Sequence, residues 1–288
     1  MAPDLLWKIK EGTNVKLKNH DPNYLDKDIQ RDSVDSTLQK LGEELNELQE
    51  LMQAAQHKSL LMILQGMDTS GKDGTIRHVL GHVNPQGCDV HSFKAPTEEE
   101  LGHDFLWRVH RVTPRKGVMG IFNRSHYEDV LIARVHNLVP ESVWSRRYKE
   151  INNFEKLLAD NDTIILKFFL HISSEEQEQR LLEREQDKDK AWKITADDWI
   201  DRQYWEDYQR AYEDAISKCS TGVAPWYIVP ANHKWYRNLT IAHVLVDTMR
   251  RYKDEWKAQL ELRGQRELEK LKKVRGAQII KDAKEAIE

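Results

Sequence analysis

The feature that most constrains the fold is a series of short apolar runs separated by helix-like stretches. The first run, residues 59–65 (SLLMILQ), does not alternate between apolar and polar positions, which is typical of a strand buried on both faces of a parallel sheet. Similar runs lie at 117–122, 163–170 and 226–229, and a weaker one at 89–93. Stretches with helical character lie between and after them, at 71–84, 97–112, 126–136, 140–160, 174–186, 196–218 and 234–262. This alternation predicts a three-layer α/β/α fold around a five-stranded, doubly wound parallel sheet.

The 288 residues divide into an arm, one large domain and a tail. Residues 1–32 are polar without sustained periodicity, and we expect an N-terminal arm that either wraps the domain or is mobile. Residues 33–262 form the α/β domain, which opens with a helix at 33–56 whose apolar stripe packs on the core or pairs with a second copy. Residues 263–288 are rich in charge and predict a solvated helical tail, with polyanion binding as the alternative.

Composition and charge exclude several classes of protein. The chain has 44 Lys and Arg against 48 Asp and Glu, a net charge of −4, which argues against a nucleic-acid-binding domain. We find no run of 18 apolar residues and no signal peptide, so we expect a cytoplasmic protein without a membrane span. Only Cys88 and Cys219 are present, which does not support a disulfide framework.

A glycine-rich segment directly after the first apolar run carries the strongest functional signal. Residues 66–75 read GMDTSGKDGT and match the pattern G-x-x-x-x-G-K of a phosphate loop. The glycines let backbone N–H groups point at phosphate oxygens, the following helix adds positive potential at its N-terminus, and the lysine neutralises a terminal phosphate. The residues predicted to bind phosphate here are Gly66, Met67, Asp68, Thr69, Ser70, Gly71, Lys72, Asp73 and Gly74.

Two departures from the usual phosphate loop indicate that metal binding is built differently here. Asp73 stands where the usual loop has the Ser or Thr that holds Mg²⁺. The runs at 117–122 and 163–170 lead into Asn123 and His171, so neither supplies the aspartate of a Walker B element. Asp68 lies inside the loop, where its carboxylate can hold the metal or orient the acceptor, with a loop-stabilising turn as the alternative.

Charged residues follow the strand predicted at 117–122. In an open α/β sheet, residues at the carboxyl ends of the strands line the ligand crevice. The segment 123–130 (NRSHYEDV) places Arg124, Glu128 and Asp129 there, and Arg124 has a guanidinium fork suited to phosphate oxygens. The alternative for all three residues is a salt-bridge cluster at the surface.

A highly charged segment at 173–202 predicts a lid. Arg180 and Arg184 share one helical face, and Lys188, Lys190 and Lys193 follow closely. Basic side chains on a mobile segment over a phosphate loop would exclude water and stabilise the oxygens of a transferring phosphoryl group. The alternative is a solvated helix with balanced charges, since five glutamates lie in the same segment.

Several motifs together resemble those of the polyphosphate kinase 2 family over roughly residues 35–258. They are GMDTSGKDGT, SFKAPTEEELGHDFLWRVHR, GIFNRSHYEDV, RLLEREQDKDKAWK and APWYIVPANHKWYRN, in this order along the chain. The resemblance implies a P-loop kinase-like fold with a helical lid. It also implies transfer of phosphoryl groups between inorganic polyphosphate and nucleotides with Mg²⁺, or Mn²⁺ in its place, by a homo-oligomer that is a dimer or a tetramer.

The resemblance also assigns roles to individual side chains. Asp68 and Lys72 match the loop aspartate and lysine of the family, Asp68 as the metal ligand, and Arg124 matches its phosphate-binding arginine. Arg180 and Arg184 match the lid arginines. Basic residues that face the phosphates in the family correspond to Lys94 and Arg108, and the nucleotide-binding positions correspond to Asn123, Glu128 and Asp129.

The segment 123–130 further resembles the class III branch of the family, which acts on nucleoside mono- and diphosphates. Glu128 stands where another branch has asparagine, and Asn123 stands where other branches have aspartate. The expected reaction is therefore reversible transfer of the terminal phosphoryl group of polyphosphate to AMP and ADP, with Glu128 among the catalytic residues. Two alternatives stay open: an ATP-dependent nucleotide or small-molecule kinase on the same fold, and a nucleotide- or polyphosphate-binding regulator without turnover.

Overall fold

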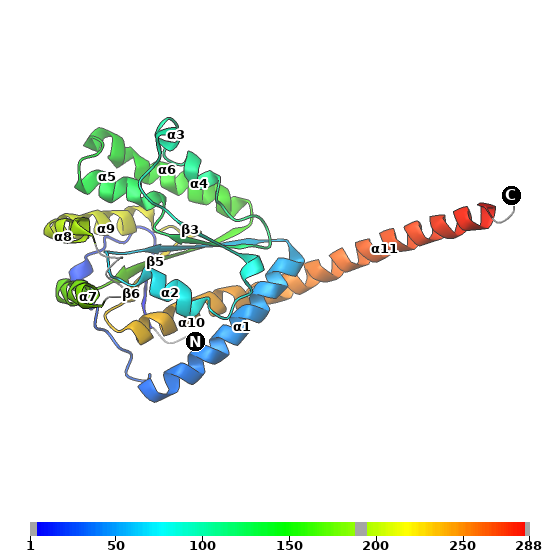
Figure 1. Ribbon diagram of the computed structural model, residues 1–288, viewed down its shortest axis with the longest axis horizontal. Coiled ribbons are helices and arrows are strands. Elements are labelled where there is room, and N and C mark those ends of the chain that lie inside the picture. Colours follow the sequence, from blue (N-terminus) through cyan, green and yellow to red (C-terminus); the bar gives the residue numbers. More distant parts are fainter. Residues whose placement is uncertain (1–4, 188–194, 286–288) are drawn as a thin grey trace.

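One six-stranded sheet forms the centre of the computed structural model (Figure 1). The structure describes residues 5–187 and 195–285, with side chains up to residue 277. The five predicted strands are present and parallel to one another, in the spatial order β6-β5-β2-β4-β3. They are β2 (Ser59–Gln65), β3 (Cys88–Ser92), β4 (Met119–Asn123), β5 (Thr163–His171) and β6 (Trp226–Pro230). Because later strands lie on both sides of β2, its carboxyl end lies at the switch point where α/β proteins bind ligands.

The sixth strand, β1 (Trp7–Lys8), comes from the N-terminal arm and was not expected from the sequence. It pairs antiparallel with β6, with Trp7 opposite Ile228, so the sheet is mixed rather than purely parallel. Two residues in a polar segment give no periodicity that could reveal a strand. Four apolar residues of the arm, Leu5, Ile9, Val15 and Leu17, are buried, so its described part packs along the domain.

Helices cover both faces of the sheet, as the three-layer prediction requires. Figure 1 shows α1 (Val34–Ala55), α2 (Lys72–Val79) and α10 (Lys234–Arg250) on one face and α6 (Glu141–Asp160) on the other. The predicted stripe of the first helix is buried at Val34, Leu41, Leu45, Leu48 and Met52. The α1 helix packs on α10 and on the start of the last helix, so the stripe lies against the chain's own core.

Several of the predicted helical stretches are divided in the structure, because breaks of one to five residues leave little trace in an apolar pattern. The stretch 97–112 contains α3 (Glu98–Leu101) and α4 (Trp107–His110), and 126–136 contains the 3₁₀ helix η4 (His126–Val130) and α5 (Ile132–Val135). The stretch 196–218 is divided at Tyr204 into α8 (Ala196–Gln203) and α9 (Trp205–Cys219). The charged segment before it forms α7 (Ser174–Gln186), and short 3₁₀ helices lie at Leu17–Asn19, Arg31–Ser33 and Pro85–Gly87.

The C-terminal part of the chain is one long helix, α11 (Lys253–Glu285), separated from α10 by two residues. The tail expected from residue 263 is therefore continuous with a helix that begins ten residues earlier. Trp256 is fully buried and Arg263 donates a hydrogen bond to the carbonyl of Ala54 at 2.8 Å, which fixes the start of α11 on the domain. Figure 1 shows the rest of α11 projecting away from the sheet. No helix of the described residues is long and apolar enough to cross a membrane.

A buried charged network lies between β5 and the helices on one face. Lys167, in the middle of β5, donates to Glu155 Oε2 at 2.5 Å, to the Tyr127 hydroxyl at 2.9 Å and to the carbonyl of Cys219 at 2.6 Å. Glu155 Oε1 also accepts a hydrogen bond from the Tyr127 hydroxyl at 2.8 Å. Because Tyr127 belongs to η4, the network fixes the segment that carries Glu128.

Candidate active site

The phosphate loop lies between β2 and α2, as the sequence motif predicts. Gly66 and Gly71 have φ angles of 153° and 102°, which L side chains rarely adopt. A Cβ atom on Gly66 would lie 2.8 Å from the carbonyl of Leu170, so the backbone also passes too close to β5 for any side chain. Thr69 is left-handed as well, with a φ of 65°, and helix α2 begins at Lys72. The loop therefore presents the N-terminus of a helix at the ligand-binding edge of the sheet.

Lys72 is buried in the loop and folds back over it. Its Nζ donates to the carbonyls of Gly66 at 2.8 Å and Met67 at 3.2 Å. Burial, together with the positive charge of Arg124, lowers the pKa of Lys72 from 10.5 to about 8. An ammonium group has three donors, and the two carbonyls occupy two of them.

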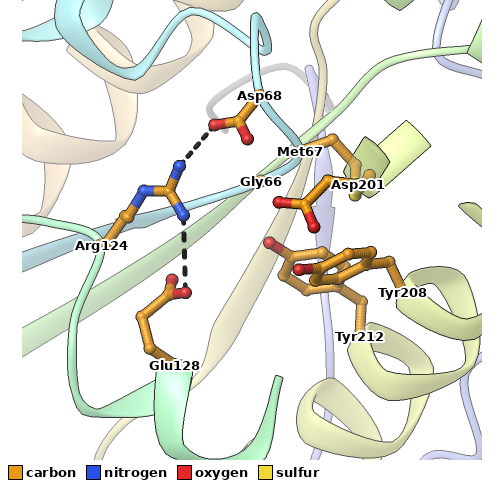
Figure 2. Close-up of a pocket in the computed structure, with 8 residues that line it drawn as sticks. All are labelled: Gly66, Met67, Asp68, Arg124, Glu128, Asp201, Tyr208 and Tyr212. Carbon is orange, nitrogen blue, oxygen red and sulfur yellow. Dashed lines mark hydrogen bonds and ion pairs between the residues drawn. The ribbon is translucent and has the colours of Figure 1, made fainter. Parts of the chain in front are cut away.

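Arg124 lies between two carboxylates, in the arrangement that Figure 2 shows. Its guanidinium contacts Asp68 Oδ1 at 2.5 Å and Glu128 Oε2 at 3.5 Å. The residue directly follows β4 and has a φ of 63°, so the backbone turns sharply at the carboxyl end of this strand. Glu128 and then Asp68 raise the pKa of Arg124, which is therefore permanently charged. The structure thus brings Asp68 of the phosphate loop beside Arg124 and Glu128, which lie in a distant part of the chain.

The pocket around this ion pair also includes residues that the sequence analysis did not select. It is lined by Gly66, Met67, Asp68, Arg124 and Glu128, and on the other side by Asp201, Tyr208 and Tyr212. Figure 2 shows the carboxylate of Asp201 and both tyrosine hydroxyls directed into the pocket from α8 and α9. Burial raises the pKa of Tyr208 and of Tyr212, so both are neutral hydrogen-bonding groups. The spacing of the two tyrosines, one helical turn apart, was the available sequence signal.

Asn123, Asp73 and Asp129 lie near the pocket without lining it. Asn123 ends β4 and donates to Asp73 Oδ1 at 2.7 Å, which joins the strand end to the first turn of α2. Asp129 forms ion pairs with Arg147 at 3.0 Å and Arg108 at 3.8 Å. Burial raises the pKa of Asp129 to about 6 against the opposing effect of these arginines.

Arg108 and Lys94 are neighbours, but only Lys94 is exposed. Arg108 is 8% exposed and donates to the carbonyl of Lys94 at 2.9 Å, with Glu100 at 3.6 Å on another side. The guanidinium of Arg108 is therefore occupied by groups of the protein in this structure. The salt-bridge alternative for Arg124, Glu128 and Asp129 describes Asp129, which pairs with two arginines. Arg124 and Glu128 also form an ion pair, but both line the pocket.

The two predicted lid arginines lie one turn apart on α7. Arg180 is only 5% exposed and is directed at the phosphate loop, where its Nη1 donates to the carbonyl of Thr69 at 2.9 Å. Arg184 is half-buried further along the helix. The predicted lid lysines, Lys188, Lys190 and Lys193, lie outside the described residues.

The carboxylates of the pocket could hold a divalent metal only if phosphate oxygens of a substrate supplied further ligands. The described residues contain no group of three His, Cys, Asp or Glu that could hold a metal ion by itself. Asp68 contacts Arg124 through Oδ1, so its Oδ2 can serve as a metal ligand. A hard ion bound through one carboxylate and several phosphate oxygens fits this donor set.

The fold and the loop define the class of the protein, a P-loop kinase-like α/β protein. Residues 28–257 match the family model of Polyphosphate kinase 2. The chain belongs to this polyphosphate kinase 2 family, as the resemblance predicts, and is therefore a phosphotransferase. Membership of a kinase family also implies a divalent metal cofactor.

Individual relatives and a solved structure agree with this family. The chain is 50% identical over 244 residues to the AMP/ADP-polyphosphate phosphotransferase of Meiothermus ruber, and the matched region covers 84% of this chain and 91% of the relative. It is 43% identical over 259 residues to the ADP-polyphosphate phosphotransferase of Rhodopseudomonas palustris, with coverages of 84% and 88%. The crystal structure of polyphosphate kinase 2 from Arthrobacter aurescens TC1 superposes with a TM-score of 0.80 at 42% identity, over 86% of this chain and 88% of that one.

Proposed function

We propose that this protein transfers the terminal phosphoryl group of inorganic polyphosphate to AMP and ADP. The observation that carries the proposal is the pocket at the carboxyl ends of β2 and β4, where Lys72 and Arg124 supply positive charge beside a phosphate loop. The loop has Asp73 in place of a hydroxyl residue, and β4 ends in Asn123, so it departs from the usual nucleoside triphosphatase site. The relative from Meiothermus ruber, named for both AMP and ADP, supports these two acceptors.

The donor would be held by cations and by backbone N–H groups. Lys72 already directs its ammonium group across the loop, and its third donor is available for a phosphate oxygen. Arg124 would offer its fork to the transferring phosphoryl group, while Asp68 and Glu128 fix the position of its guanidinium. The phosphate loop, residues 66–74, would bind the phosphates next to it, and Lys94 and Arg184 are further cations for a long chain of phosphates.

A phosphate nucleophile requires no general base. The terminal oxygens of AMP and ADP are already largely ionised at neutral pH, so the protein has to align the acceptor with the donor and stabilise charge. We place the acceptor next to Glu128, with Asp129 and Asn123 behind it. The hydroxyls of Tyr208 and Tyr212 face the same pocket and are suited to donate hydrogen bonds to it.

We infer that the divalent metal is Mg²⁺, which Mn²⁺ can replace. Asp68 would hold it, because this carboxylate lies inside the loop and is 20% exposed. When bound, the ion would neutralise negative charge on the phosphoryl oxygens during transfer. The homo-oligomer stays a prediction, for which the exposed leucines of α11, Leu260, Leu262, Leu268 and Leu271, are suitable interface residues.

The proposal is tested by a chromatographic assay with AMP, Mg²⁺ and long-chain polyphosphate in the absence of ATP. We expect ADP to form first and ATP to follow. Formation of product only from added ADP would refute the AMP part of the proposal and the role of Glu128 as a marker of the branch. Formation of product only after ATP is added would show a nucleotide donor and refute the proposal.

A further inference from the structure

The backbone carbonyls of the first five residues of the phosphate loop, 66–70, accept hydrogen bonds from side chains. Gln177 Nε2 donates to the carbonyl of Asp68 at 3.4 Å, Arg180 Nη1 to that of Thr69 at 2.9 Å, and Arg237 Nη1 to that of Ser70 at 3.1 Å. Lys72 holds the two preceding carbonyls, of Gly66 and Met67. Every carbonyl from 66 to 70 therefore accepts a hydrogen bond from a side chain, and two of the donors are buried arginines.

Arg180 donates its hydrogen bonds to other groups of the protein. Its Nε donates to Glu176 at 2.6 Å, and its Nη2 donates to the carbonyls of Ala231 at 2.8 Å and Asn232 at 2.7 Å. Both carbonyls lie just beyond the end of β6. Arg180 thus joins the phosphate loop to the carboxyl end of another strand, and four of its five N–H donors are engaged.

Arg237, on α10, lies directly behind the loop. It is 2% exposed, and its Nε and Nη2 donate to Asn238 Oδ1 at 3.2 Å and 2.9 Å. A Cβ atom on Gly71 would lie 1.8 Å from Arg237 Nη1, so the guanidinium packs against the glycine itself. Among the described residues, no carboxylate forms an ion pair with Arg237, and the neighbouring charge that acts on it is the positive charge of Arg180.

Because no carboxylate pairs with Arg237, its positive charge is not neutralised by a neighbouring side chain. Burial and the neighbouring charge of Arg180 lower the pKa of Arg237 to about 9, which still leaves it charged at neutral pH. Carbonyl oxygens carry partial negative charge, and holding them from behind keeps the N–H groups of the loop directed at the anion. A fixed cation in a buried site adds to the attraction for phosphate without any rearrangement when the ligand binds.

We propose that Arg180 and Arg237 are positioning residues of the phosphate loop, which hold the carbonyls of Thr69 and Ser70 from behind and strengthen anion binding without touching the substrate. For Arg180, this role replaces the direct phosphate contact that the resemblance implies. The identity of the anion rests on the proposed function, whereas the positioning role does not.

The test measures binding of sodium tripolyphosphate to the full-length protein by titration calorimetry, without a nucleotide. Removing a hydrogen bond from a charged group in a buried site predicts at least about tenfold weaker binding for Arg237→Met and for Arg180→Met. Arg237→Lys keeps a positive charge and N–H donors but loses the guanidinium fork, and should recover part of the loss. Arg250→Met is the matched control on the same helix, because Arg250 pairs with Glu44 at the surface and should leave the affinity unchanged.

If Arg180 and Arg237 only stabilised the fold, their Met variants would unfold more easily but would still bind tripolyphosphate as tightly as the wild type. Folded Met variants that bind tripolyphosphate as tightly as the wild type would overturn the inference. If a Met variant does not fold, the affinity of Arg237→Lys for tripolyphosphate decides the question. An affinity equal to that of the wild type would overturn the inference, whereas a several-fold loss supports it. A wild-type protein that binds MgATP but not tripolyphosphate would refute the proposed function alone, and the same variants would then be compared with MgATP.

Discussion

The unusual environment of Lys72 predicts how the use of the donor depends on pH. Burial lowers its pKa from 10.5 to about 8, which corresponds to about 3 kcal/mol by which the site disfavours the charged form. Only the ammonium form attracts phosphate, so the charged fraction sets the affinity of the free enzyme. That fraction falls from about 90% at pH 7 to about 10% at pH 9 if the pKa is about 8.

The quantity to measure is kcat/KM for polyphosphate at saturating ADP and Mg²⁺, because it reports on groups of the enzyme before the donor binds. We expect a decrease of about tenfold between pH 7 and pH 9. In Lys72→Arg, which stays charged over this range, the value should be lower but nearly independent of pH. A wild-type value that stays constant up to pH 9.5 would show that Lys72 titrates normally and would refute this reasoning.

Three further predictions concern the metal ligand, the loop and the core. Asp68→Ala should lower turnover by at least about 10²-fold in a steady-state assay, because it removes one preorganised electrostatic group, and near wild-type turnover would contradict its role. Gly71→Ala should abolish most activity, since its Cβ would collide with Arg237 at 1.8 Å, whereas Gly264→Ala has open space and should leave activity intact. Lys167→Ala should lower the free energy of unfolding in urea by about 3–5 kcal/mol, because it leaves Glu155 buried without its partner. A loss below about 1 kcal/mol would show that this ion pair contributes little.

The parts of the fold that could be predicted are those encoded by neighbouring residues. The phosphate loop was evident because strand, glycines and lysine are contiguous. Strands β2, β4, β5 and β6 were evident because burial on both faces removes polar residues from the sequence, whereas the largely exposed edge strand β3 left only a weaker run. Lys167 is the exception that β5 tolerates, since its partners Glu155 and Tyr127 come from other elements. The pattern of neighbouring residues in the sequence cannot predict a buried ion pair between distant elements.

The parts that could not be predicted depend on contacts between distant segments. Asp201 lies on α8, Tyr208 and Tyr212 lie on α9, and the break at Tyr204 separates the two helices. A one-residue break of this kind leaves no mark in the apolar pattern. Arg180 was predicted to face phosphates, yet the carbonyls that hold it lie 111 and about 50 residues away along the chain. A basic residue near a phosphate loop can serve the ligand or the loop, and only the fold distinguishes the two.

The most direct test of the central claim follows the phosphoryl group itself. Polyphosphate labelled with ³²P would be incubated with unlabelled AMP and Mg²⁺ in the absence of ATP, and the nucleotides separated after a short reaction. We expect label in the β-phosphate of ADP, and its near absence with Lys72→Ala. Label that appears only as free phosphate, or equal labelling of ADP by Lys72→Ala, would contradict transfer from polyphosphate at this site.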